Sequence, residues 1–433
     1  MKYNMKNAIA RIFNLEPDEI ESIQVEEYGD ESIAFIRITD SIQHCPRCAV
    51  STRKLHDNRT RELNHAVING TPFTLVYNYR RFKCPACGKV FPEANPFAAP
   101  HSRLSRFSII RGMTMLKNPR ITFSQVAMEL GVSVNTVIRM FDKYAGITQI
   151  DMPECLCIDE VYMVKYKQKV YACVMVDMLT NQIYDLRPSR KKFELSSYFS
   201  SISYEDKSKV KYICIDMWKT YRDLSYTYFP NAKVCVDSFH VIQLINRMFT
   251  GIRVKVMKQF DEKSEQYRLL KKYHWILDKD MSKLNLDRII NLHYYHKELG
   301  TQYISIRNLL SCMLQIDPEL EIAYEIKDRY TYINKHYEAD KIEAILDDFI
   351  DELPMYGMQE LESLSRTLLE WRNEIINSYD RYQGRRISNG PVESLNARLK
   401  TIKNNACGYK NFDRFRTRAL YSLNRNSSIK NKR

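Results

Sequence analysis

The sequence predicts an α/β protein whose mixed sheet is interrupted by a helical segment and preceded by a small β-rich zinc-binding region and a helix pair. Three observations support this prediction. Apolar β-type runs are concentrated in residues 151–245, charged amphipathic helical patterns with no strand signature fill residues 246–380, and two Cys-x-x-Cys pairs lie within the first 100 residues. The predicted domains are residues 1–100 (β-rich, zinc-binding), 101–150 (helix-turn-helix), 151–245 (first part of the α/β core), 246–380 (all-helical insertion) and 381–433 (last part of the core, with basic C-terminal helices).

Charge predicts a polyanionic partner. The chain has 66 Lys and Arg against 52 Asp and Glu, a formal charge of +14. Residues 381–433 contain 14 basic residues and two acids, and residues 51–120 contain 13 and three, so two separate contacts with nucleic acid are expected. No run approaches the roughly 20 apolar residues that cross a bilayer. We therefore expect no membrane contact, a cytoplasmic location and reduced cysteines.

The N-terminal cysteines have the spacing of a zinc site. Each Cys-Pro-x-Cys pair forms a tight turn, and two such turns supply four thiolates in a tetrahedron. The expected ligands of structural Zn²⁺ are Cys45, Cys48, Cys84 and Cys87. Free buried cysteines are the alternative, and they are the interpretation for the isolated ones such as Cys157, Cys173, Cys214 and Cys235.

Residues 121–144 have the pattern of a helix-turn-helix. Ser124 is expected to cap the first helix, Gly131 to make the turn and Ser133 to cap the second helix, which would bury Val134, Val137, Ile138 and Phe141. Its exposed face would present Asn135, Thr136 and Arg139 to a major groove. Two ordinary packed helices are the alternative.

Three apolar β-type runs in the predicted core end in aspartate. The runs are Leu156–Asp159, Ile213–Asp216 and Val234–Asp237. Aspartate commonly starts turns, which gives each one a structural explanation. At Asp159 the β pattern continues, so its carboxylate is expected within the sheet, where an ionised group is costly unless a cation faces it.

A basic helix near the C-terminal end carries one acid. Val392, Leu395, Leu399 and Ile402 form its apolar stripe, and Glu393, Asn396 and Lys400 are expected together on another face. Gly390 is the expected cap, and Glu393 at the third position would favour the helix dipole, so a capping role is the structural alternative for that glutamate.

Taken in order, these segments resemble the ISL3-type family of bacterial insertion-sequence transposases. The segments that carry the resemblance are the two Cys-Pro-x-Cys pairs, RRFKCPACGKVFPE, the helix-turn-helix, Asp159-Glu160, Asp216-Met217 with Tyr221, DSFHV at 237–241 and SNGPVE at 388–393. Each is short, but the ordered set covers nearly the whole chain. Ser394 departs mildly from the glycine that the family often has.

The resemblance implies an RNase H-like catalytic core with a DDE triad that holds two Mg²⁺ or Mn²⁺ ions. The implied catalytic and metal-binding residues are Asp159, Asp216 and Glu393. Asp237, His240, Asn396 and Lys400 would adjoin the site, and Arg398 and Lys403 are expected to contact DNA.

The function expected from this resemblance is metal-dependent DNA strand cleavage and strand transfer. The partners would be double-stranded DNA, as terminal inverted repeats and as target, and at least one further copy of the chain in the complex that pairs two ends. Such a protein would be associated with the nucleoid. A domesticated DNA-binding regulator and a structure-specific nuclease on the same core are the alternatives.

Overall fold

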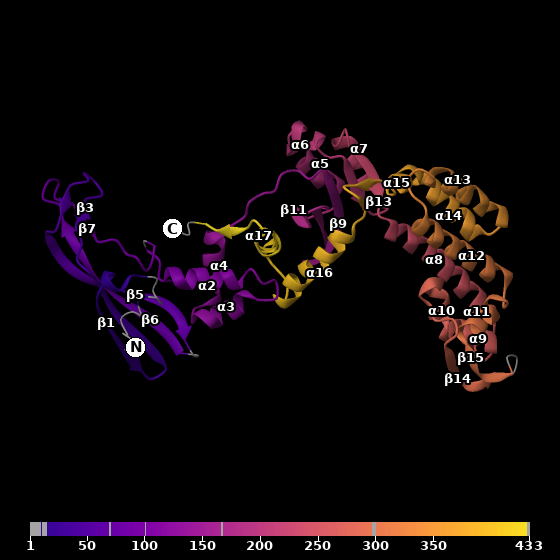
Figure 1. Ribbon diagram of the computed structural model, residues 1–433, viewed down its shortest axis with the longest axis horizontal. Coiled ribbons are helices and arrows are strands. Elements are labelled where there is room, and N and C mark those ends of the chain that lie inside the picture. The colour runs from indigo at the N-terminus through magenta and orange to yellow at the C-terminus, as the bar shows by residue number, and fades with distance from the viewer. Residues whose placement is uncertain are drawn as a thin grey trace. The chain divides into compact units, whose positions relative to one another are not determined.

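The computed structural model describes residue 10 and residues 15–68, 71–99, 101–165, 168–296 and 300–430 (Figure 1). It divides into two compact units. Unit 1 comprises Met1–Gln149, Met163–Lys169 and Asn396–Arg433, and unit 2 comprises Ile150–Tyr162 and Val170–Leu395. Among the described residues, no helix is both long and apolar enough to span a bilayer.

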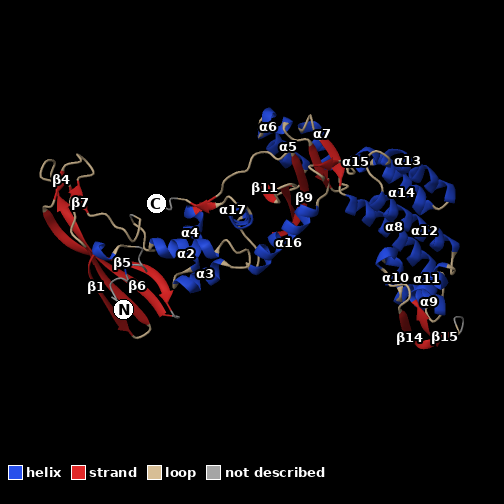
Figure 2. Ribbon diagram, viewed as in Figure 1, coloured by secondary structure: helices blue, strands red, loops and turns tan. Residues whose placement is uncertain are grey.

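Unit 1 begins with a five-stranded sheet (Figure 2). Its strands run in the order β1-β2-β6-β5, with β7 paired to β6. Their bounds are β1 Ile20–Tyr28, β2 Glu31–Ile38, β5 Leu55–Ile68, β6 Thr71–Lys83 and β7 Val90–Pro92. The β1–β2 hairpin turns at Gly29, whose φ of 54° favours glycine. The short strands β3 (Gln43–His44) and β4 (Ser51–Thr52) pair on either side of the first cysteine pair.

Three helices follow the sheet in unit 1. They are α2 (Arg106–Met115), α3 (Phe123–Leu130) and α4 (Val134–Tyr144). Gly131 ends α3 with a φ of 62°, and the side chain of Ser133 caps α4, both as expected. Two details of the prediction were wrong. Thr122 caps α3 in place of Ser124, because Thr122 and Gln125 form a capping box, and Val134 is 38% exposed in the first turn of α4.

The core of the helix-turn-helix includes the C-terminal helix α17 (Phe412–Leu423). The buried Arg418 of α17 donates hydrogen bonds to the carbonyl oxygens of Leu116, Asn118 and Ile121, and the Tyr421 hydroxyl donates to Met113. Strand β18 (Ser428–Ile429) also pairs with β8 (Ala145–Gly146). Residues assigned from sequence to the end of the α/β core thus complete the helical part of unit 1, as the yellow α17 beside the violet α4 illustrates (Figure 1).

Unit 2 is built on a mixed five-stranded sheet in the order β11-β10-β9-β12-β13. Strands β10 and β11 are antiparallel, whereas β12 is parallel to both β9 and β13. The strands are β9 Cys155–Lys165, β10 Gln168–Asp177, β11 Gln182–Arg187, β12 Tyr212–Ile215 and β13 Lys233–Val236. The helices between them are α5 Lys192–Ser201, α6 Tyr204–Ser208 and α7 Lys219–Tyr228. The predicted mixed α/β sheet is confirmed.

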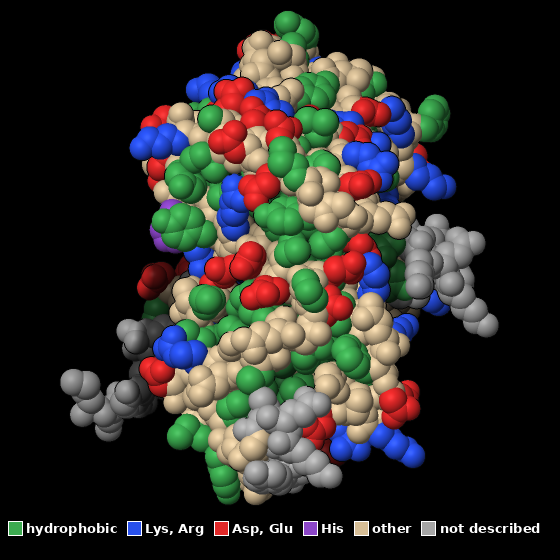
Figure 3. All heavy atoms as spheres, turned by 90° about the vertical axis from the view of Figure 1, so that its right-hand side faces the viewer, with side chains coloured by type: hydrophobic (Ala, Val, Ile, Leu, Met, Phe, Trp, Pro, Cys, Tyr) green, Lys and Arg blue, Asp and Glu red, His purple; other side chains and the backbone are tan. Residues whose placement is uncertain are grey.

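The segment expected to be all-helical is mainly helical but contains a hairpin. Strands β14 (Ile289–His296) and β15 (Thr301–Ser305) pair antiparallel within it, so the absence of strands was wrongly predicted. Its helices are α8 Ser238–Met257, α9 Glu265–Lys272, α10 His274–Asp278, α11 Ile306–Leu314, α12 Pro318–His336, α13 Ile342–Glu352, α14 Gln359–Glu370 and α15 Arg372–Asn377. The boundary predicted after residue 245 falls inside α8. Acidic and basic side chains are interspersed over the face of this segment that Figure 3 shows.

Candidate active site, zinc site and nucleic-acid surface

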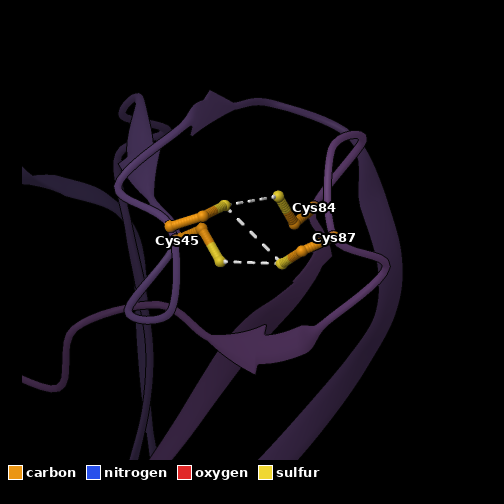
Figure 4. Close-up of side chains that lie close together, drawn as sticks. Cys45, Cys84 and Cys87 are labelled. Atoms are coloured by element: carbon orange, nitrogen blue, oxygen red, sulfur yellow. Dashed lines mark hydrogen bonds between the residues drawn. The ribbon is translucent and has the colours of Figure 1, made fainter.

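The four predicted zinc ligands lie together in unit 1. Their sulfur atoms all lie within 4.8 Å of one another. Cys45 Sγ is 3.6 Å from Cys87 Sγ, and Cys48 Sγ is 3.5 Å from Cys84 Sγ (Figure 4). Four sulfur donors on two facing turns match the tetrahedral geometry of structural Zn²⁺. The expected cysteine cluster is confirmed.

The backbone of each turn favours thiolates. Burial raises the pKa of the Cys45 thiol, but hydrogen bonds from the backbone N–H groups of Arg47 and Cys48 bring it to about 6. The pKa of Cys84 is also lowered, first by the backbone N–H of Cys87. The pKa of Cys48 is instead raised to about 12, because hydrogen bonding to Cys84 and burial outweigh the backbone N–H of Val50. Thiolates are the form that binds zinc, so each turn contributes one cysteine, Cys45 or Cys84, whose thiolate is favoured before the metal binds.

In unit 2, Asp216 and Asp237 directly follow the parallel strands β12 and β13, and Asp159 lies within the neighbouring strand β9. Strand β12 pairs with β9 so that Cys214 faces Cys157, and the same register two residues on brings Asp216 beside Asp159. On its other side β12 pairs Ile215 with Val236, and the N–H of Asp237 donates to Ile215. The three runs that look alike in the sequence are therefore neighbouring strands of one sheet, although β9 continues beyond Asp159 to Lys165.

This edge is electrostatically strained without a cation. Burial and the charge of Glu160 together raise the pKa of Asp216 to about 6, against the opposing charge of His240. Burial also raises the pKa of Asp159, against the opposing effect of a hydrogen bond from the backbone N–H of Glu160. Asp216 Oδ1 is buried and accepts no hydrogen bond from the described residues. A buried acceptor without a donor is costly, and a metal ion would satisfy it.

Asp237 and His240 form a pair beside the two aspartates. His240 Nδ1 lies 3.3 Å from Asp237 Oδ2, and Asp237 is 3% exposed. The hydrogen bond to Asp237 raises the pKa of His240, assisted by the charges of Asp216 and Asp159 and opposed by burial. Protonation of His240 is therefore favoured by the carboxylates around it.

The helix that carries Glu393 begins at the same edge. Helix α16 spans Gly390–Asn405, and the preceding Asn389, which is fully buried, donates from its backbone N–H to Asp237 Oδ1 at 3.2 Å. The Asn389 side chain donates to the carbonyl of Ile158 at 3.4 Å. These bonds tie the start of α16 to β9 and β13, one turn before Glu393. Asn389 belongs to the SNGPVE segment, in which only Glu393 was predicted to have a role at the site.

Glu393 itself is exposed, and its oxygens do not complete a tight cluster with the two aspartates. Among the described residues, the four cysteines form a group whose donor atoms all lie within 4.8 Å of one another, and Asp159, Asp216 and Glu393 do not form such a group. Three carboxylates that close would repel one another without a cation. The apolar stripe of α16 is confirmed as buried. Asn396, expected on another face together with Glu393 and Lys400, is only 7% exposed, whereas those two residues are exposed.

A basic cavity lies beside α4 in unit 1. Its volume is about 610 Å³, and three of its lining residues, Thr136, Arg139 and Lys143, lie on one face of α4. Arg103 and His101, from the segment before α2, line the opposite side. None of the residues that line this cavity is acidic. Asn135, also on α4, is exposed. On α16, Arg398 and Lys400 are exposed and Lys403 is half-buried.

Known proteins match the chain in the same order as these parts. A zinc-finger of transposases IS204, IS1001, IS1096 and IS1165 matches residues 42–87, which include all four cysteines. A helix-turn-helix domain of transposase family ISL3 matches residues 93–145. An ISL3 family described as transposase matches residues 156–419.

Two curated proteins are similar. The transposase for insertion sequence element IS1001 of Bordetella parapertussis is 20% identical over 393 residues, which cover 90% of this chain and 91% of that protein. A protein of Lactococcus lactis subsp. lactis named ATP-dependent protease is 26% identical over 128 residues, covering 30% of this chain and 38% of that protein, and so short a match carries no function to this chain. The zinc-finger, helix-turn-helix and transposase matches follow one another along the chain, and the last covers more than half of it. The chain therefore belongs to the ISL3 family of transposases.

Proposed function

We propose that this transposase binds the terminal inverted repeats of its insertion sequence, cuts the DNA there and joins the released 3′ ends to target DNA. The observation that carries the proposal is the alignment of Asp159 and Asp216 on adjacent strands, beside the anchored start of the helix that bears Glu393. The strand order β11-β10-β9-β12-β13, in which β10 and β11 are antiparallel and β12 is parallel to β9 and β13, also supports an RNase H-like core. The helical segment between Asp216 and Glu393 would be its insertion.

The acidic residues fit divalent magnesium or manganese. Carboxylate oxygens are the hard ligands that Mg²⁺ prefers, and Asp216 Oδ1 is a buried oxygen that accepts no hydrogen bond from the described residues. Asp159, Asp216 and Glu393 would hold two ions. Bound ions would activate the attacking oxygen and neutralise the leaving 3′ oxygen during phosphodiester cleavage.

The remaining residues at this edge would fix the geometry of the acids and offset their charge. Asn389 fixes where α16 begins and thereby limits where Glu393 can reach. Asp237 holds His240, whose positive charge partly compensates the carboxylates. Such orientation contributes to catalysis because the reacting groups are already positioned when DNA binds.

Sequence recognition would belong to unit 1. Asn135, Thr136 and Arg139 would read base edges while Arg103 and Lys143, which line the cavity beside α4, contact the backbone. Arg398, Lys400 and Lys403 would contact DNA next to the reacting end. A complex that pairs two element ends requires at least two copies of the chain.

The test is joining of a repeat-ended duplex to plasmid DNA in Mg²⁺ or Mn²⁺. The repeat sequence comes from the DNA that flanks the coding region. The intact chain should give joined products, and Asp159→Asn, Asp216→Asn and Glu393→Gln should each bind the repeat and fail to join it. Joining by Glu393→Gln at the normal rate would remove Glu393 from the site.

Two other results would favour the alternative functions. Repeat binding by the intact chain without any cutting in either metal would favour a DNA-binding regulator. Cutting of branched duplexes in preference to repeat ends would favour a structure-specific nuclease. The gathered zinc ligands and the acid-free cavity beside α4 support recognition of a sequence over recognition of a branch.

A further inference from the structure

Arg190 is an arginine at the acidic edge of unit 2 that the proposed function does not use. It lies between β11 and α5, and its Nη1 donates a hydrogen bond to Glu160 Oε1 at 2.5 Å. Glu160 directly follows Asp159 in β9. The guanidinium is therefore tied to the residue next to the first proposed metal ligand.

Two aromatic rings hold the same guanidinium. Its Cζ lies 4.4 Å from the centre of the Tyr171 ring and 4.9 Å from that of the Trp218 ring. Trp218 comes two residues after Asp216, and Tyr171 belongs to β10. Rings at these distances attract a planar cation through their π faces and restrict its orientation. Arg190 is thus held by residues adjacent to both proposed catalytic aspartates.

The held guanidinium can still donate hydrogen bonds outward. Its side chain is 37% exposed, and the hydrogen bond recorded for it within the described residues goes to Glu160. Guanidinium has five N–H groups in a planar fork that matches the oxygens of a phosphate. Four of them therefore remain for a ligand, on a side chain whose plane is already fixed.

Arg190 differs from another arginine with similar contacts, Arg187, in which carboxylate it contacts. Arg187 has the same kind of contacts, with its Cζ 4.3 Å from the Tyr198 ring centre and Nη1 3.8 Å from Asp185 Oδ2. Its carboxylate partner, however, lies on the edge strand β11 and not next to one of the two proposed catalytic aspartates in the sequence. Arg187 is therefore a matched control with similar exposure, 36% against 37%.

We propose that Arg190 binds a backbone phosphate of the DNA strand next to the phosphodiester that reacts, and that Glu160 and the two rings position it. This inference rests on the proposed function. Asp159, Glu160, Asp216 and Asp237 make the edge acidic, so it repels a DNA strand except where cations offset the charge. Because Glu160 Oε1 already accepts from Arg190, Glu160 is assigned to holding the arginine.

The first test measures binding without cutting. The full chain and its variants bind a repeat-ended duplex in Ca²⁺, and affinity is measured at several salt concentrations. Arg190→Gln should weaken binding about tenfold and reduce the salt slope by about 0.9, the value for one lost phosphate contact on duplex DNA. Arg190→Lys should keep the slope, and Arg187→Gln should change neither quantity.

The second test separates a DNA contact from support of the fold. Arg190→Gln should bind Mn²⁺ without DNA as the intact chain does, and in Mg²⁺ it should need about tenfold more duplex for half-maximal joining. Glu160→Gln should need about threefold more, because its arginine is less restrained.

An unchanged salt slope in Arg190→Gln would overturn the inference, and so would loss of Mn²⁺ binding with a lowered melting temperature. Failure of the intact chain to join DNA would count against the proposed function alone. The slopes in Ca²⁺ would still decide whether Arg190 touches a phosphate.

Discussion

The two candidate metal sites of this transposase differ in how completely they are formed. In unit 1, four cysteine sulfurs already lie within 4.8 Å of one another. In unit 2, Asp159 and Asp216 are side by side on neighbouring strands, but Glu393 stands exposed on α16 and does not complete an equally tight group. Thiols can be neutral and hydrogen bond to one another, whereas carboxylates at the same spacing repel. A folding site can thus be formed before its metal binds, while a catalytic site is expected to close on its metal.

Loss of zinc should produce the largest effect. Cys84→Ser removes a buried ligand, and structural zinc contributes about 10 kcal/mol or more to the folding of small domains. We expect residues 42–87 to lose their structure and repeat binding to fail, while Mn²⁺ binding by unit 2 persists. Circular dichroism, zinc content and Mn²⁺ titration measure this. Normal repeat binding by the zinc-free variant would show that the cluster is dispensable.

Removal of a carboxylate should have opposite effects on stability and on activity in unit 2. Asp216→Asn should lower joining at least about 1,000-fold, equivalent to about 4 kcal/mol. In the metal-free protein it should raise the melting temperature, since an ionised group with a buried, unpaired oxygen is replaced by a neutral one. A lowered melting temperature would mean that the aspartate stabilises the fold, and the contrast with the cysteines would fail.

The pH dependence of metal binding should follow the raised pKa of Asp216. Divalent metal binds the ionised carboxylate, whose pKa is about 6, so Mn²⁺ affinity should be level above pH 7 and fall about tenfold per unit well below pH 6. Without metal the folded state binds the proton more tightly than the unfolded state, so stability should decrease as pH rises through 6. Titration calorimetry and melting curves measure both slopes. Constant Mn²⁺ affinity down to pH 5 would contradict the raised pKa.

The smallest predicted effect concerns the cavity beside α4. Lys143→Gln and Arg103→Gln should each reduce the salt slope of repeat binding by about 0.9 and weaken binding equally for matched and mismatched repeats. Arg139→Gln should instead reduce discrimination between repeat sequences. Equal loss of discrimination in all three variants would mean that the cavity does not separate backbone contacts from base contacts.

The sequence was most informative where residue chemistry is local. Cysteine spacing predicted the zinc ligands, and the three apolar runs ending in aspartate predicted the strands whose ends meet at one edge. The hairpin of β14 and β15 was missed because it lies among amphipathic helices. Burial of Asn396 was missed because periodicity gives the centre of a buried stripe but not its width. The Thr122 cap could have been found, since Gln125 completes its capping box.

The joining of α17 to the core of α2, α3 and α4 bears on the order in which the chain matures on the ribosome. Tyr421 packs into a core whose other buried residues lie between Leu104 and Ala145, and Arg418 donates a hydrogen bond to the same region. The α/β sheet and the helical segment of unit 2 are translated between these two parts of the core. At about 5–20 residues per second, that interval lasts on the order of ten seconds or more. A nascent chain therefore completes the core of its helix-turn-helix only after the whole sheet of unit 2 has been synthesised, and a prematurely terminated product that lacks α17 would leave this core unfinished.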